Sequence, residues 1–247
     1  MGGKNATIVF GDLDADDLDA TVMGAVRAGF ANQGQICLCG SRLFIESSIF
    51  EKFTKAFVEQ TAKVFSEKIG NPLESGYGSL ISLEHRAKVE KYVDLAQKEG
   101  GKILLGGKRP VFDAKDKHLN EGAFFCPTII SGLSPFDSQC ATQEIFGPVV
   151  TVHSFESESE VVDMANCTEY GLAASIWTKD VTKAHRVAQN IETGMVWINC
   201  WLHRDLRVPF GGVKSSGVGR DGGLHSMDFW TETKNICVKI PQLPLNQ

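Results

Sequence analysis

The chain has 247 residues, of which 43% are hydrophobic and 22% charged, and its formal net charge is −5. This composition indicates a globular protein with a sizeable core. The net negative charge does not favour binding to nucleic acid, and no apolar run reaches the about 20 residues that span a bilayer. Neither nucleic acid nor a membrane is therefore expected as a partner. The seven scattered cysteines predict free thiols and a cytoplasmic location.

Strands and helices alternate along most of the chain. Continuous β-branched runs such as ATIVF are typical of buried parallel strands, and apolar residues at helical spacing predict helices. In chain order we expect a strand at 6–10, an acidic turn at 12–19, a helix ending at Phe30, a strand at 41–46, helices at 49–65 and 83–99, a strand at 100–107, a loop at 111–121, strands at 124–133 and 148–155, a helix at 159–166, a strand at 172–179, a helix ending at Ile191 and a strand at 194–200. This order predicts the α/β class, with a mostly parallel open sheet flanked by helices and joined by right-handed crossovers.

The C-terminal part of the chain has a different pattern. Residues 203–227 are rich in Gly, Ser and Arg, which is typical of a long functional loop. Residues 229–240 predict a lone strand, and a terminal strand with no following helix is a candidate for pairing with another subunit. We therefore expect one domain over 1–228, a C-terminal oligomerisation strand and tail over 229–247, and a homodimer or homotetramer assembled through that strand.

The segment GFANQGQICLCGSR (29–42) places two cysteines, Cys37 and Cys39, one residue apart after a polar turn. A metal site would need further Cys or His ligands at close spacing, and none lies near in the sequence, so no metal is expected. Two interpretations stay open for each thiol, a buried apolar residue or a nucleophile. The preceding turn favours a nucleophile at Cys37, since free backbone N–H groups there can stabilise a thiolate or an oxyanion. The two side chains point the same way in an extended segment and diverge in a helical turn.

FANQGQIC (30–37) resembles the nucleophile motif of the aldehyde dehydrogenase superfamily. Matching motifs occur in the family's order over essentially the whole chain: GGKN (2–5), EIFGPV (144–149), YGLAASIW (170–177), WINC (197–200) and PFGGVKSSGVGRDGG (209–223). The resemblance implies an aldehyde dehydrogenase catalytic domain over 1–228. Such a domain oxidises a small aldehyde to a carboxylic acid with NAD, or NADP, as the hydride acceptor.

The resemblance also implies roles for individual residues. Cys37 aligns with the catalytic cysteine, whose thiolate adds to the aldehyde and later forms a thioester that water hydrolyses. Cys39 aligns with a residue behind it. Glu144 aligns with the glutamate that accepts hydrogen bonds from the nicotinamide ribose, and Phe146 with an aromatic residue beside the nicotinamide.

The segment NCWLHRDLRVPFGG (199–212) resembles the subfamily that acts on 2-aminomuconic or 2-hydroxymuconic semialdehyde, which are small aldehydes with a carboxylate. Arg204 matches an arginine that this subfamily uses against the carboxylate, and Arg207 is a second candidate. A guanidinium binds a carboxylate with two parallel hydrogen bonds, which is the physical reason for this choice. The alternative is that both arginines are ordinary exposed loop residues.

The chain departs from the family pattern near its first residue. In the family, the general base is a glutamate two residues before the Gly-Gly pair, and the cofactor domain and an oxyanion-binding asparagine also precede that pair. The 247 residues of this chain include none of these three parts. An alternative interpretation is therefore a truncated, inactive fragment that acts as an oligomerisation or interaction module, and we expect these 247 residues alone not to reduce NAD. A more distant alternative is a thiol hydrolase that uses Cys37 on activated esters.

Overall fold

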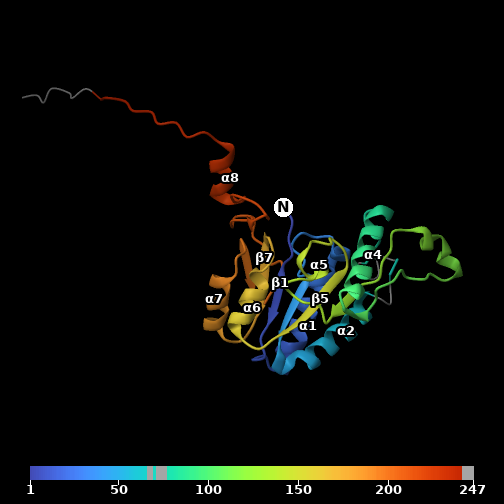
Figure 1. Ribbon diagram of the computed structural model, residues 1–247. Coiled ribbons are helices and arrows are strands. Elements are labelled where there is room, and N and C mark those ends of the chain that lie inside the picture. The colour runs from blue at the N-terminus through green and yellow to red at the C-terminus, as the bar shows by residue number, and fades with distance from the viewer. Residues whose placement is uncertain (66–68, 71–76, 241–247) are drawn as a thin grey trace, which may run out of the picture.

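The computed structural model describes residues 1–65, 69–70 and 77–240, and among them seven strands form one sheet (Figure 1). The order across the sheet is β3-β4-β5-β2-β1-β7-β8, and the neighbours are parallel except for the antiparallel β3–β4 pair at one edge. The bounds are β1 Ala6–Val9, β2 Arg42–Glu46, β3 Lys102–Leu105, β4 Thr128–Ser131, β5 Val149–Phe155, β7 Ala173–Trp177 and β8 Met195–Ile198. The predicted α/β class with a mostly parallel sheet is confirmed.

Helices cover both faces of this sheet. Along β1, Ile8 packs in the cluster that contains α6 and α7 side chains, whereas the next residue, Val9, packs in the cluster that contains α1 and α2 side chains. This alternation is what a parallel strand buried on both faces requires. The helices are α1 Ala15–Phe30, α2 Phe50–Phe65, α4 Leu83–Lys98, α5 Gln139–Thr142, α6 Glu158–Asn166, α7 Val181–Asn190 and α8 Gly223–Trp230. None of the helices in the described ranges is long and apolar enough to cross a membrane.

The acidic stretch before the first helix belongs partly to that helix. We expected a turn over 12–19, but α1 begins at Ala15 and Asp14 caps it by accepting a hydrogen bond from the Asp17 amide. Asp16 and Asp17 then lie in the first turn, where negative charge interacts favourably with the helix dipole. The loop expected at 111–121 also differs, since Ala114–Glu121 forms 3₁₀ turns.

The C-terminal strand expected at 229–240 is not a strand in this chain. Phe229 and Trp230 end α8, and residues 231–240 have no regular secondary structure and are exposed. Figure 1 shows this arm leading away from the body, so no strand of the described residues lies beside it to complete a hydrogen-bonded ladder. The predicted boundary at residue 228 lies inside α8. The two-part division and the role of the arm in assembly stay predictions.

A buried histidine makes stability depend on pH. His153 on β5 is 5% exposed, and burial, helped by the nearby charge of Arg42, lowers its pKa from 6.5 to about 3. In acid the unfolded chain therefore binds a proton at this position that the folded chain does not, so stability is lost as pH falls from 6.5 towards 3. We expect the free energy of unfolding to fall by about 2 kcal/mol between pH 7 and about pH 5 on account of His153.

Urea denaturation of the chain and of His153→Gln at both pH values checks this prediction. Glutamine stays neutral and can still bond to the Thr151 hydroxyl, which lies 2.8 Å from His153 Nε2. The variant should lose less stability in acid than the parent chain, whereas the exposed His118→Gln control should keep the parent's acid dependence. Equal acid dependence in the parent and His153→Gln would show that His153 titrates normally.

Candidate active site

The segment before Cys37 is a tight turn at the end of α1. Asn32, Gln33 and Gly34 all have positive φ, at 50°, 56° and 69°, a conformation that costs an ordinary L-residue roughly 1–2 kcal/mol. At Gly34 a side chain would collide with the carbonyl of Gly147, so only glycine fits there. The expected polar turn is present, and its glycine allows the backbone next to Phe146 to approach closely.

The two cysteines diverge because they lie in a turn rather than in an extended segment. Cys39 is 5% exposed, its amide donates to the Ile36 carbonyl at 2.9 Å, and burial raises the pKa of its thiol to about 12. Cys37 is partly exposed and packs, as Trp197 and Phe210 do, against the apolar cluster of Leu38, Leu172 and Ala173. Of this pair, the structure leaves Cys37 as the accessible thiol and gives Cys39 a packing position.

Asn5 holds the backbone of residues 31–39, the cysteine turn, in place. Its side-chain amide donates to the carbonyls of Cys37 and Cys39 at 2.8 and 2.9 Å, and its Oδ1 accepts from the Ala173 amide at 3.1 Å. Asn5 ends the GGKN motif, but its contact with Cys37 spans 32 residues of chain, so no local pattern predicts it. The asparagine is a positioning residue that the sequence analysis missed.

Glu144 lies on the other side of the same N-terminal segment. Gly3 donates its amide to Glu144 Oε1 at 3.0 Å, and a side chain on Gly3 would come within 2.7 Å of the Cys37 carbonyl. At Gly2 a side chain would meet Glu144 Oε2 at 2.7 Å and the ring of Tyr170 at 3.3 Å. Because residues 2 and 3 have no side chains, the half-buried Glu144 carboxylate and the cysteine turn can lie on either side of this backbone segment.

Phe146 presents its ring at the surface beside the cysteine turn. Its backbone has φ 59°, the residue is 37% exposed, and its carbonyl lies 2.6 Å from His85 Nε2. Lys88, one turn further along α4, donates to the Glu144 carbonyl at 3.4 Å. The half-buried Glu144 carboxylate, the exposed Phe146 ring and the Lys88 cation thus lie close together before the start of β5.

The two arginines of the 199–212 segment have different surroundings. Arg204 lies over the Phe210 ring, 4.6 Å from its centroid, and lines a cavity of about 250 Å³ with Trp197. Trp197 and Phe210 pack against the same apolar cluster as Cys37, so the cavity and the thiol adjoin one cluster of side chains. The Trp201 indole fastens this segment to the cysteine turn by donating to the Leu38 carbonyl at 2.9 Å.

Arg207 does not share this position. Its side chain is 88% exposed, it pairs with Asp205, and it is not among the residues that line the cavity. The structure therefore separates the two arginines that the sequence analysis considered together.

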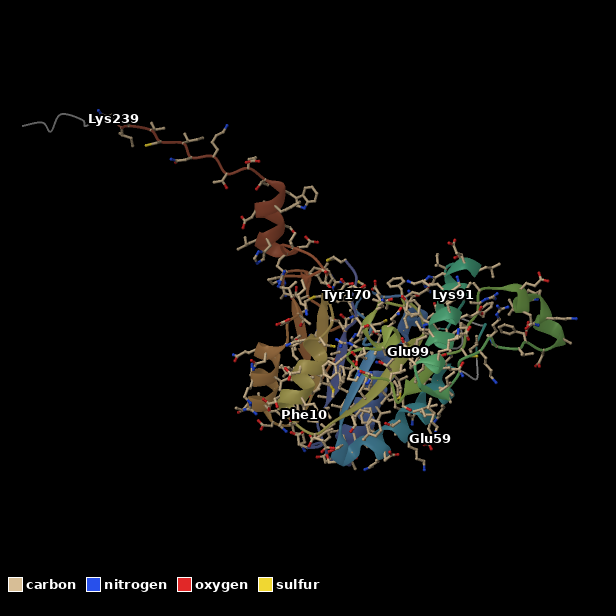
Figure 2. The ribbon with its side chains drawn as sticks, viewed as in Figure 1. Phe10, Glu59, Lys91, Glu99, Tyr170 and Lys239 are labelled. Atoms are coloured by element: carbon tan, nitrogen blue, oxygen red, sulfur yellow. The ribbon has the colours of Figure 1, made fainter. Side chains whose placement is uncertain are left out.

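Asn5, the cysteine turn, Glu144 and Phe146 gather at the amino ends of the parallel strands. Asn5 precedes β1, the cysteine turn precedes β2, and Glu144 and Phe146 precede β5. Figure 1 shows the N-terminus at this edge, and Figure 2 shows Tyr170 there. Within the described ranges, no group of three or more His, Cys, Asp or Glu side chains could hold a metal ion.

The arrangement offers a hydrogen-bond acceptor and an aromatic face close together. The Glu144 carboxylate receives the Gly3 amide on one oxygen and can accept ribose hydroxyls, and the Phe146 ring offers a face to an aromatic ring. The backbone carbonyl of Cys37 lies across Gly3 from this carboxylate.

Comparisons with known proteins agree with these observations. The sequence model of the aldehyde dehydrogenase family matches residues 1–236. The chain is 47% identical to 2-aminomuconic semialdehyde dehydrogenase of Mus musculus over 241 residues, and 47% identical to 2-hydroxymuconic semialdehyde dehydrogenase of Pseudomonas putida over 242 residues. Each match covers 97% of this chain and 48% of the relative, so the chain spans about half the length of these curated relatives.

Solved structures give the same result. Betaine aldehyde dehydrogenase from Staphylococcus aureus, crystallised in complex with NAD⁺, superposes with a TM-score of 0.85 and 40% identity over 93% of this chain and 44% of its own. HpcC from Thermus thermophilus superposes with a TM-score of 0.89 and 38% identity over 99% of this chain and 47% of its own.

Proposed function

Since this chain belongs to the aldehyde dehydrogenase family, we propose that its full natural chain oxidises a carboxylate-bearing semialdehyde, such as 2-aminomuconic semialdehyde, to the carboxylic acid. NAD is the proposed hydride acceptor, and NADP is the alternative. The observation that carries the proposal is the placement of an accessible Cys37 and a half-buried Glu144 on either side of Gly3. The free thiols of all seven cysteines support a reducing compartment such as the cytoplasm.

Cys37 is the proposed nucleophile. Its thiolate adds to the carbonyl carbon of the aldehyde, and the carbonyl oxygen becomes an oxyanion. The amide N–H of Cys37 donates to no other group in the described part of the chain, so it is free to donate to that oxygen. One such donor is typically worth about 2.7–4 kcal/mol of transition-state stabilisation. The Asn5 amide fixes the backbone of this residue by donating to the Cys37 carbonyl at 2.8 Å.

Glu144 and Phe146 are the proposed contacts of the cofactor. The Glu144 carboxylate would accept the ribose hydroxyls, and the Phe146 ring would pack beside the ring that accepts hydride. When bound, NAD supplies the two-electron acceptor for aldehyde oxidation. The resulting thioester on Cys37 is then hydrolysed, which releases the carboxylic acid and restores the thiol.

Arg204 is the proposed partner of the substrate carboxylate. It lines a cavity with Trp197 and Phe210, which pack against the same apolar cluster as Cys37, and the named relatives at 47% identity act on semialdehydes of the muconic type. Arg207, exposed and paired with Asp205, is a weaker candidate for this role.

We also propose that the C-terminal arm contributes to self-association, as a homodimer or homotetramer. Large apolar side chains along it are exposed, among them Ile236 at 77%, Val238 at 75% and Ile240 at 82%. An isolated chain would leave these side chains in water, which favours their burial against another subunit.

Aldehyde-dependent NADH formation by the full natural chain tests the proposed activity, and Glu144→Gln tests the cofactor contact within the same assay. Glutamine can still accept the Gly3 amide but loses the charge and one acceptor oxygen. Since a hydrogen bond to a charged group contributes about 1.5–3 kcal/mol, the KM for NAD should rise by roughly 10- to 100-fold.

Glu59→Gln is the matched control, because Glu59 is exposed on α2 and Figure 2 shows it at the opposite end of the body from Tyr170. This variant should leave the KM for NAD unchanged. An unchanged KM in Glu144→Gln would remove Glu144 from the cofactor site, whereas the absence of NADH formation by the unmodified protein would refute the proposed activity itself.

A further inference from the structure

His85 is held at a fixed place in the first turn of α4. Ser82 caps this helix, and its hydroxyl accepts a hydrogen bond from the His85 amide at 3.1 Å. The imidazole is half-buried and reaches away from the helix to the segment before β5. The cap therefore fixes the backbone from which the ring extends.

The ring contacts the backbone of Phe146. His85 Nε2 lies 2.6 Å from the Phe146 carbonyl oxygen, and the two rings meet edge to face with centroids 6.2 Å apart. A carbonyl oxygen only accepts, so the imidazole must carry its proton on Nε2 and donate it. The contact thus specifies one tautomer of His85.

The backbone that receives this bond is in an unusual conformation. Phe146 has φ 59°, which a phenylalanine seldom adopts without support from its surroundings. The next residue, Gly147, is packed on both sides: a side chain there would come within 2.5 Å of Val89 on α4, and its carbonyl faces Gly34 of the cysteine turn. The peptide after Phe146 is packed between α4 and the cysteine turn. The hydrogen bond from His85 to the Phe146 carbonyl is a further contact that fixes this peptide.

The segment that precedes α4 also contacts the cysteine turn. The Ile81 amide donates to Gln35 Oε1 at 3.0 Å, four residues before His85. The segment 81–85 therefore bonds to both halves of the candidate site, the turn that leads to Cys37 and the backbone that presents Phe146.

We propose that His85 is a positioning residue, which holds the Phe146 ring in the orientation that packs against the nicotinamide end of NAD. This inference rests on the proposed function, because it assigns the ring to the cofactor. Without the bond, the peptide at Phe146 can relax, and the ring leaves its place for part of the time.

Binding of NAD to the full natural chain tests the proposal, with isothermal titration calorimetry as the readout. His85→Leu should weaken NAD affinity by about 3- to 10-fold, the range that the loss of one hydrogen bond produces. His85→Gln, whose amide can still donate to the Phe146 carbonyl, should recover most of that loss. His118→Leu removes an exposed imidazole and should have no effect.

The same substitutions in a Phe146→Gly background separate positioning from general stability. Glycine adopts positive φ freely and has no ring to orient, so His85→Leu should then change NAD affinity by less than about twofold. An equal loss in both backgrounds, or the absence of rescue by His85→Gln, would overturn the proposal.

Nitrogen-15 NMR of the imidazole provides a readout that does not need NAD. The expected result is an Nε2-protonated ring in the unmodified protein. If that protein binds no NAD, the proposed function fails, and the tautomer alone then decides whether His85 holds Phe146: a ring protonated on Nδ1 only would overturn the inference.

Discussion

Replacing Cys37 by serine in the full natural chain should lower aldehyde-dependent NADH formation by about 10⁴-fold or more. Serine keeps the size of the side chain but is a far weaker nucleophile at neutral pH, and without the adduct on residue 37 the aldehyde has no route to hydride loss. Cys39→Ser makes the same chemical change two residues away. Because Cys39 is 5% exposed and packs behind the turn, that control should affect stability more than turnover.

Alkylation provides a second measurement on the nucleophile. Cys167 and Cys237 are exposed, so both are first replaced by serine to remove simple accessibility from the comparison. Iodoacetamide should then modify Cys37 before Cys39, whose pKa burial raises to about 12, and before Cys200, whose pKa burial also raises. Faster labelling of Cys39 or Cys200, located by peptide mass spectrometry, would contradict the assignment of Cys37.

Hydrophobic periodicity was enough to predict most elements of this fold. The strand predicted at 148–155 is β5, Val149–Phe155, and the helix predicted at 83–99 is α4, Leu83–Lys98, because each has a local pattern of the right period and length. The order of strands across the sheet and the antiparallel β3–β4 edge depend on contacts distant in sequence, which no local pattern carries. The C-terminal strand predicted at 229–240 is not formed by the single chain, because β-propensity makes a strand only where a neighbouring strand is available, and its pairing with another subunit stays a prediction.

The candidate site was predictable only as a set of residues. The motifs and the family resemblance selected Cys37 and Glu144, but their placement on either side of Gly3 depends on contacts that join residues 3 and 144. Asn5 and His85 have no local pattern that marks them, because each acts on a backbone carbonyl far away in the sequence. The site also lies at the amino ends of the strands, whereas open parallel sheets usually place ligands at their carboxyl ends.

Replacing Arg204 by alanine should weaken transition-state binding of a carboxylate-bearing semialdehyde by about 2 kcal/mol or more, which is about 30-fold or more in kcat/KM. The guanidinium is exposed in the free chain, so we expect the lower part of the about 2–5 kcal/mol range for a desolvated charge pair. Its position over the Phe210 ring fixes the direction from which it can meet the carboxylate.

Two comparisons make this expectation specific. Arg207→Ala removes the same side chain from a position that is 88% exposed and paired with Asp205, and it should change kcat/KM little. A neutral aldehyde of similar length should be affected by neither substitution, because it has no carboxylate for a guanidinium to bind. If Arg204→Ala slows the neutral aldehyde as much as the semialdehyde, then Arg204 supports the loop rather than the substrate. A loss confined to the semialdehyde, partly restored by Arg204→Lys, would instead identify a charge contact, since lysine retains the charge without the two-pronged geometry of arginine.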